Sequence, residues 1–203
     1  MVEPEDLLNL MKTRRSIRRY QDRPVPEEMI EQLLEAARWA PSSTNSQPWE
    51  FIVVCDEAVR RLVGEHSTYY FVRMQHVAEA PLIIALVGKP KATPFYREDV
   101  AIASAQIMLQ AQALGLGTCW IGAFEREAVA RILKLPQDAE LVGLLTVGFP
   151  AQVPPPPPRK PLASLVHYDV YGNRKKGEAV RPGFVTSGLL SIILSHLRLP
   201  FRI

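Results

Sequence analysis

The sequence is poor in several features that would identify a function. Its 203 residues include only two cysteines, Cys55 and Cys119, and neither belongs to the spacing of a zinc site or a redox pair. The four histidines show no metal-ligand spacing either. These absences argue against a disulfide scaffold and a metal centre. Because each cysteine lies inside an apolar run, we expect both thiols to be buried as small hydrophobic groups.

Strong charge and long apolar runs are also missing. A formal net charge of +3 is too small to indicate a general nucleic-acid binder. The apolar C-terminal segment, residues 184–203, is interrupted by His196, Arg198 and Pro200 before it reaches the ~20 residues that a bilayer span needs. We expect it to pack on a partner subunit instead. The chain opens without the pattern of an export signal, which predicts a cytoplasmic location.

The usual nucleotide-binding and catalytic signatures are absent as well. The stretch GLGTCWIG, residues 115–122, contains G-x-G, but its third glycine is misplaced. It also leads from a predicted helix to a predicted strand, which is the reverse of the Rossmann order. No P-loop appears, and no nucleophile with a matched base can be named. Ordinary acid–base or nucleophilic catalysis is therefore not indicated.

What the sequence does contain is a clear pattern of helices and strands. Apolar periodicity and proline positions predict helices over residues 4–12, 26–40, 96–114 and 125–133, and strands over 51–54, 81–87, 118–121 and 141–147. Their order lacks the regular alternation of a doubly wound fold, which favours an α+β fold with a sheet flanked by helices. We expect one core over residues 1–153. A stiff proline run then leads into a C-terminal arm, residues 154–203.

Positive charge is concentrated in the stretch RRSIRRY, residues 14–20, which has four arginines in seven residues. A solvated charged loop, a nucleic-acid contact and a phosphate site all fit such a cluster. Guanidinium groups bind phosphate oxygens bidentately, and a serine hydroxyl adds a donor. Two other features favour phosphate. Arg159 and Lys160 follow the proline run, and the polar loop PSSTNSQPW, residues 41–49, suits a polar heterocycle or a ribityl chain.

Taken together, these stretches resemble the nitroreductase family of flavoproteins. The matching motifs are RRSIRRY, APSSTNSQPWEFIVV from Ala40 and ALGLGTCWIGAF from Ala113, followed by VGFP and the basic pair after the prolines. The resemblance implies a central mixed or antiparallel sheet flanked by helices. It also implies an intertwined homodimer that binds two molecules of flavin mononucleotide (FMN) at its interface.

The resemblance further implies a set of flavin-binding residues. Arg14, Arg15 and Ser16 would hold the phosphate and ribityl end, Arg18 would reach toward the isoalloxazine ring, and Arg159 or Lys160 would complete the phosphate site. A loop from the second subunit would contribute Pro41, Ser42, Ser43, Asn45 and Gln47. The ring would lie along Trp120, Ile121, Gly122 and Ala123. Arg73 and His76, at helical spacing, would reach its polar edge.

The function implied is the transfer of hydride from NADH or NADPH to FMN and then, in a ping-pong sequence, to a nitroaromatic, a quinone or a related electrophile. Several family members carry glutamate where this chain has Gly122, which leaves the physiological acceptor open. A dehalogenase, a dehydrogenase or a flavin-fragmenting enzyme of the same fold is an alternative. A flavin-binding protein without turnover and an RNA-binding protein that uses the basic loop represent other classes.

Overall fold

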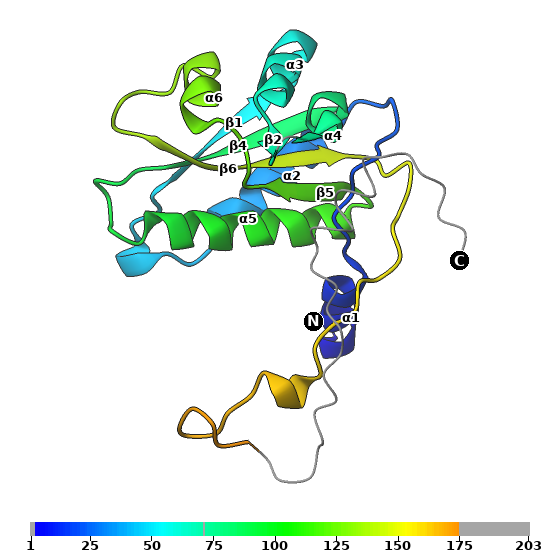
Figure 1. Ribbon diagram of the computed structural model, residues 1–203, viewed down its shortest axis with the longest axis vertical. Coiled ribbons are helices and arrows are strands. Elements are labelled where there is room, and N and C mark those ends of the chain that lie inside the picture. Colours follow the sequence, from blue (N-terminus) through cyan, green and yellow to red (C-terminus); the bar gives the residue numbers. More distant parts are fainter. Residues whose placement is uncertain (1–2, 71, 175–203) are drawn as a thin grey trace. The chain divides into compact units, whose positions relative to one another are not determined.

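The computed structural model of the chain describes residues 3–70 and 72–174. The chain divides between Pro154 and Pro155 into two units, and each is described by itself. The first unit combines helices with an antiparallel sheet (Figure 1). The predicted α+β class is therefore confirmed.

The predicted helices and strands are present in the first unit, with ends shifted by at most two residues. The helices are α1 (Pro4–Thr13), α2 (Glu27–Arg38), α3 (Glu57–Glu65), α4 (Gln75–Glu79), α5 (Tyr96–Ala113) and α6 (Arg126–Ile132), together with the short 3-10 helix η1 (Ser43–Asn45). The strands are β1 (Trp49–Val54), β2 (Thr68–Tyr69), β3 (Val72–Arg73), β4 (Leu82–Gly88), β5 (Gly117–Ile121) and β6 (Glu140–Gly148).

The main sheet has four antiparallel strands in the order β1-β4-β6-β5, and β2 pairs with β3 separately. Strand β4 lies between β1 and β6, and every one of its residues is buried. Alternate side chains of a strand point to opposite faces of its sheet. The uninterrupted apolar run of β4 therefore supplies core residues to both faces.

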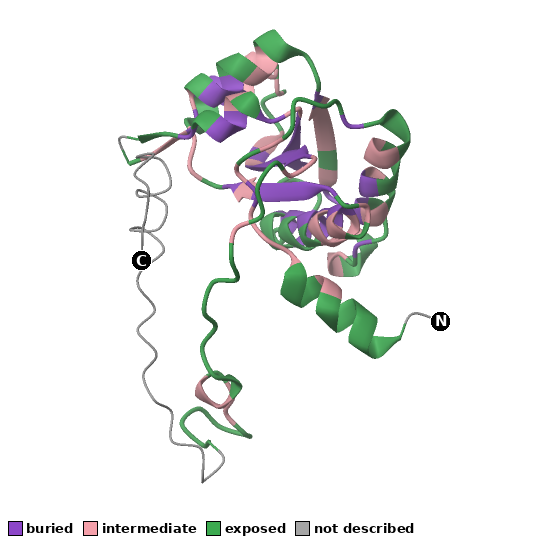
Figure 2. Ribbon diagram, turned by 90° about the vertical axis from the view of Figure 1, so that its right-hand side faces the viewer, coloured by how far each residue is buried: buried purple, intermediate pink, exposed green. Residues whose placement is uncertain are grey.

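Helices cover the sheet on both faces. On one face, Leu33 of α2 and Ile107 of α5 pack into a cluster with Ile84 of β4. On the other, Val63 of α3, Val77 of α4 and Val129 of α6 pack with Ile83. Figure 2 shows the buried sheet between these layers and the almost wholly exposed α1.

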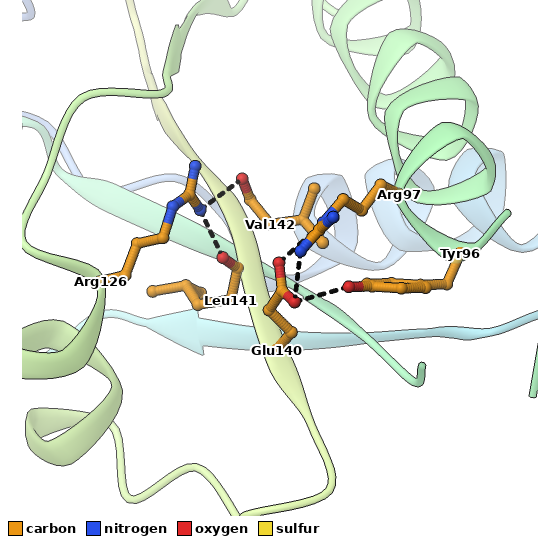
Figure 3. A network of polar contacts seen from close by, with 6 residues as sticks. All are labelled: Tyr96, Arg97, Arg126, Glu140, Leu141 and Val142. Carbon is orange, nitrogen blue, oxygen red and sulfur yellow. Dashed lines mark hydrogen bonds and ion pairs between the residues drawn. The ribbon is translucent and has the colours of Figure 1, made fainter. Parts of the chain in front are cut away.

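A polar network attaches the first turn of α5 to the start of β6 (Figure 3). The Tyr96 hydroxyl donates to Glu140 Oε2 at 2.5 Å, and Arg97 donates to both carboxylate oxygens at 2.9 and 2.7 Å. Burial acts to raise the pKa of Glu140, but the hydrogen bonds from Tyr96 and Arg97 outweigh it and lower that pKa. The network fixes where α5 begins relative to the sheet.

The burial expected for the two cysteines was wrong for one of them. Cys119 is buried as predicted, but Cys55 is exposed. Cys55 lies one residue beyond the end of β1, where the chain leaves the sheet. The apolar run before it therefore did not predict its environment.

In the second unit, residues 155–161 form neither helix nor strand, and a short 3-10 helix, η2 (Leu162–Ser164), follows. This agrees with an extended proline spacer. Within residues 3–70 and 72–174, no helix is both long enough and apolar enough to cross a membrane. The apolar segment 184–203 lies outside the described residues, and its packing stays a prediction.

We expect Glu140→Gln to lower the free energy of unfolding at pH 7 by about 1 kcal/mol, because a partly exposed charge-assisted network is weakened. The folded-state pKa of Glu140 is below its ordinary 4.5. Its contribution is thus present above that value and lost as the pH falls through the folded-state pKa. Urea unfolding at pH 7 and at about pH 3 should show the gap between wild type and variant closing in acid.

The exposed Glu127 of α6 provides the control, and Glu127→Gln should change stability little at either pH. An equal loss for Glu140→Gln at both pH values would contradict the role assigned to the carboxylate.

Candidate functional site

The arginine cluster forms a loop that runs beside β5, as predicted from its position between two helices. Ser16 forms a parallel bridge with Thr118, and the Ile17 N–H donates to the Thr118 carbonyl at 2.9 Å. Ile17 is 3% exposed and packs directly on Gly117. A Cβ added at Gly117 would lie 2.7 Å from Ile17 Cβ. Glycine at this position is what allows the loop to approach the strand so closely.

Tyr20 anchors the other end of the loop. Its hydroxyl donates to the Ile17 carbonyl at 2.7 Å and lies 2.7 Å from Thr146 Oγ1 on β6. Burial raises the pKa of Tyr20 above its ordinary range, so the hydroxyl remains a proton donor. The Gln21 N–H also donates to the Phe149 carbonyl at 2.8 Å. The backbone between Ser16 and Gln21 is thus held at both ends.

This anchoring gathers cationic and hydroxyl groups along β5. Burial raises the pKa of the Cys119 thiol, while the positive charges of Arg18 and Arg14 and a hydrogen bond from Ser16 act in the opposite direction. All three residues therefore lie near the same strand. Arg14, Ser16 and Arg18 are half-buried, so each is still partly exposed at the surface.

Arg15 is held differently from its neighbours. Its Nη1 donates to the Lys12 and Arg14 carbonyls at 2.7 and 2.9 Å. Its Nε is buried and has no hydrogen-bond partner among the described residues. The donor set here, guanidinium groups with a serine hydroxyl, matches the chemistry of a phosphate-bearing anion.

The strand that carries this cluster ends at the predicted ring-contacting segment. Trp120 is half-buried and packs against the core under α2 and α5. Ile121 is buried, Gly122 is exposed and Ala123 is half-buried. A Cβ added at Gly122 would lie 3.3 Å from Trp120 Nε1. The segment therefore leads from the core to the surface within four residues of the chain.

The polar loop predicted to contact the ring lies elsewhere. Ser42 and Ser43 are half-buried, while Pro41, Asn45 and Gln47 are exposed. The Ser43 N–H donates to Asp99 Oδ1 in the first turn of α5 at 3.1 Å. The arginine loop packs on Gly117, just after the last turn of α5. Figure 1 shows the two loops at opposite ends of this helix.

The remaining predicted residues are dispersed. Arg73 is exposed in β3 and lies 3.6 Å from Glu65, whereas His76 is buried in α4. They do not share a helix, so the helical spacing inferred for this pair was wrong. The turn at Met74 separates a strand from a helix in a segment where the sequence showed no element. Arg159 and Lys160 are exposed in the second unit.

A cavity of about 410 Å³ lies next to the arginine loop but is not part of the predicted site. Its lining includes Tyr20, Arg23, Arg60 and Leu82. Arg60 donates to the backbone carbonyls of Cys55 and Ala80, which indicates a structural brace.

Comparison with known proteins identifies the family of the chain. Residues 11–149 match the Nitroreductase family. The chain belongs to the nitroreductase family. It is therefore an oxidoreductase, and the resemblance noted in its motifs is confirmed.

Individual relatives span most of the chain. One relative, from Methanothermobacter thermautotrophicus, carries the name NADH dehydrogenase/NAD(P)H nitroreductase. It is 36% identical over 160 residues, which cover 75% of this chain and 82% of that protein. An iodotyrosine deiodinase from Thermotoga neapolitana is 29% identical over 186 residues, covering 81% and 98%. The solved structure of an FMN-dependent nitroreductase from Clostridium difficile superposes with a TM-score of 0.73 at 28% identity, covering 81% of this chain and 99% of that one.

Two residues that shape the site were not singled out from the sequence. Gly117 lay within the failed dinucleotide motif and within the matched motif ALGLGTCWIGAF, but it was given no role of its own. Asp99 was indistinguishable from Glu98, because acidic residues are common in the first turn of any helix. A contact with a distant loop distinguishes Asp99, and such a contact leaves no signal in a single sequence.

We predict that Gly117→Ala lowers the free energy of unfolding by about 1–3 kcal/mol, because the added methyl group forces Ile17 and its loop away from β5. Gly122→Ala is the matched comparison, since its methyl group needs a shift of only a few tenths of an ångström at Trp120. Urea unfolding of both variants should give the larger loss at position 117. Equal losses would show that Ile17 has room to move.

Proposed function

We propose that this protein is an FMN-dependent oxidoreductase that uses NADH or NADPH to reduce nitroaromatics, quinones or related electrophiles. The observation that carries the proposal is that Arg14, Ser16 and Arg18 lie together near β5. They provide two positive charges and a hydroxyl donor. The strand beside them leads into a segment that reaches the surface at Gly122.

The residues present fit the phosphate end of FMN. Arginine forks and a serine hydroxyl are the donors that a phosphate dianion requires. Arg15 is proposed to belong to the same donor set, and its buried Nε has no hydrogen-bond partner in the described part of the chain. Arg159 and Lys160 are proposed to complete it from the C-terminal arm.

The position of the second loop supports a site shared between two copies of the chain. Helix α5 has 18 residues and is therefore about 27 Å long. It separates the loop around Ser43 from the arginine loop, so one chain cannot place both loops on one flavin ring. A homodimer would bring the loop of one copy to the arginine cluster of the other.

Exposed apolar side chains supply a surface for such a dimer. On α1, Leu7, Leu8 and Met11 are 45–48% exposed, and none of its residues is buried. On α5, Ile102 is 41% exposed beside the exposed Ala101 and Ala105. An amphipathic helix with no covered face gains stability when a partner buries it.

FMN, when bound, supplies the hydride chemistry, and the protein supplies orientation and charge. Arg18 would place a positive charge beside the ring, an arrangement that stabilises developing negative charge without reorganisation. Trp120 to Ala123 would line the ring largely through backbone. With glycine at position 122, no side chain projects there, which leaves space for an acceptor.

A more specialised flavin enzyme of the same fold is the second candidate. A relative named an iodotyrosine deiodinase, 29% identical to this chain over 186 residues, favours it. Steady-state assays with nitroaromatic, quinone and halogenated phenol acceptors would separate the two. A flavin-binding protein without turnover would bind FMN but transfer no electrons from NADH or NADPH.

The decisive experiment is an anaerobic absorbance titration of the purified holoprotein with NADH and then NADPH. We expect a yellow protein whose flavin band bleaches with one equivalent of donor per bound flavin. A colourless protein that cannot be reconstituted with FMN would overturn the proposal. Retention of colour after addition of both donors would favour a non-catalytic flavin protein.

Variants of the arginine loop test the phosphate assignment through two measurements, the affinity for FMN and the rate at which bound FMN is reduced. Arg14→Ala should weaken FMN binding about tenfold or more, because a charge-assisted phosphate contact is lost. The exposed Arg19 of the same loop is the matched control, and Arg19→Ala should bind normally. Arg18→Ala should slow single-turnover reduction at full occupancy. Equal affinities for the Arg14 and Arg19 variants would refute the phosphate assignment.

The dimer is tested by sedimentation equilibrium. We expect the wild type to have twice the 22.8 kDa chain mass. Ile102→Glu should shift it toward monomer and reduce FMN affinity with it. Leu62→Glu, at a residue 46% exposed on α3, should leave the mass unchanged. A monomeric wild type that binds FMN fully would contradict the shared site.

A further inference from the structure

The loop at residues 42–47 has an unusual backbone. Thr44, Asn45 and Gln47 have φ angles of 51°, 57° and 46°, so three residues other than glycine adopt the left-handed region. This conformation costs roughly 1 kcal/mol or more for an L-residue, and the cost is greatest for a β-branched one such as Thr44. Strain of this kind persists only when surrounding contacts determine the conformation.

Ser42 and Asp99 restrain this loop through its backbone N–H groups. Ser42 Oγ accepts the Gln47 N–H at 2.9 Å and closes the loop on itself. Asp99 Oδ1 accepts the Ser43 N–H at 3.1 Å and ties the loop to α5. The first restraint is internal to the loop. The second fixes the loop relative to the rest of the protein, and among the residues that the structure describes it is the only hydrogen bond to the loop from a side chain outside it.

Asp99 is well placed for this task. It is 4% exposed, and its own position is set by Tyr96 and Arg97, which bind Glu140 on β6 in the same turn of α5 (Figure 3). Its second oxygen, Oδ2, is buried and has no partner among residues 3–70 and 72–174, and the same holds for Ser46 Oγ. A buried carboxylate is costly, and this one is directed at a strained loop.

We infer that Asp99 is a positioning residue that holds the loop 42–47 in the strained conformation required for flavin binding. The inference rests on the proposed function, since the loop is proposed to contact the flavin of the partner. Without the Asp99 acceptor the left-handed residues relax, and the loop must be reordered each time FMN binds. Asp99 thus acts on the flavin through the loop, without touching it.

The test compares Asp99→Ala with Asp99→Asn in the full-length protein. The asparagine keeps an acceptor for the Ser43 N–H, whereas the alanine removes it. Hydrogen exchange of the loop amides in the apoprotein measures the restraint directly. Fluorescence titration with FMN measures its effect on binding. Ser104→Ala is the matched control, because Ser104 is a buried polar residue of α5 whose hydroxyl donates to the Ala101 carbonyl of the same helix.

We expect Asp99→Ala to raise loop exchange and weaken FMN affinity about tenfold, the effect of losing one hydrogen bond to a charged group. Asp99→Asn should stay within about threefold of wild type in both measurements. If Asp99→Ala does not fold, Asp99→Leu fills the space without an acceptor and takes its place. Wild-type loop exchange and affinity in the acceptor-free variant would overturn the inference.

The outcomes also separate this inference from the proposed function. A wild-type protein that fails to bind FMN refutes the proposed function, whatever the loop exchange shows. A wild type that binds FMN, combined with an Asp99→Ala variant that binds equally well, refutes the role of Asp99 alone. Equal weakening by alanine and asparagine would also refute it, since asparagine preserves the acceptor.

Discussion

The burial of β4 on both faces is the constraint on which the rest of the structure depends. A strand with apolar side chains in both directions must be covered by two layers. One layer contains α2 and α5, and the other contains α3, α4 and α6. Because α5 packs across the sheet in this way, its two ends define two separate places at which loops can be held.

A loop is held near each end of α5, by a different physical means in each case. At the C-terminal end, close packing of Ile17 on Gly117 and a backbone hydrogen bond to Thr118 place the arginines beside β5. At the N-terminal end, the Asp99 carboxylate restrains a strained polar loop. The helix keeps the loops apart within one chain, and the proposed dimer is the arrangement that unites them.

Much of the fold could be predicted from the sequence because its periodicities are strong. The apolar run of β4 and the proline at the end of α2 predicted their elements almost to the residue. The segment between Glu65 and Pro81 was not predicted, since two-residue strands and a five-residue helix carry no period. Arg73 and His76 were consequently assigned a helical relation that they do not have.

The sequence by itself determined the α+β class, the family and the residues available for an anionic cofactor, because these depend on local pattern and on motif order. The tertiary structure decided which of those residues meet. Arg14, Ser16 and Arg18 converge on one strand, while the serine loop is held about 27 Å away across α5. The tertiary structure also decided that Cys55 is exposed and that Asp99 contacts Ser43, a residue far from it in the chain. Contacts between segments far apart in the chain depend on packing, which no local pattern encodes.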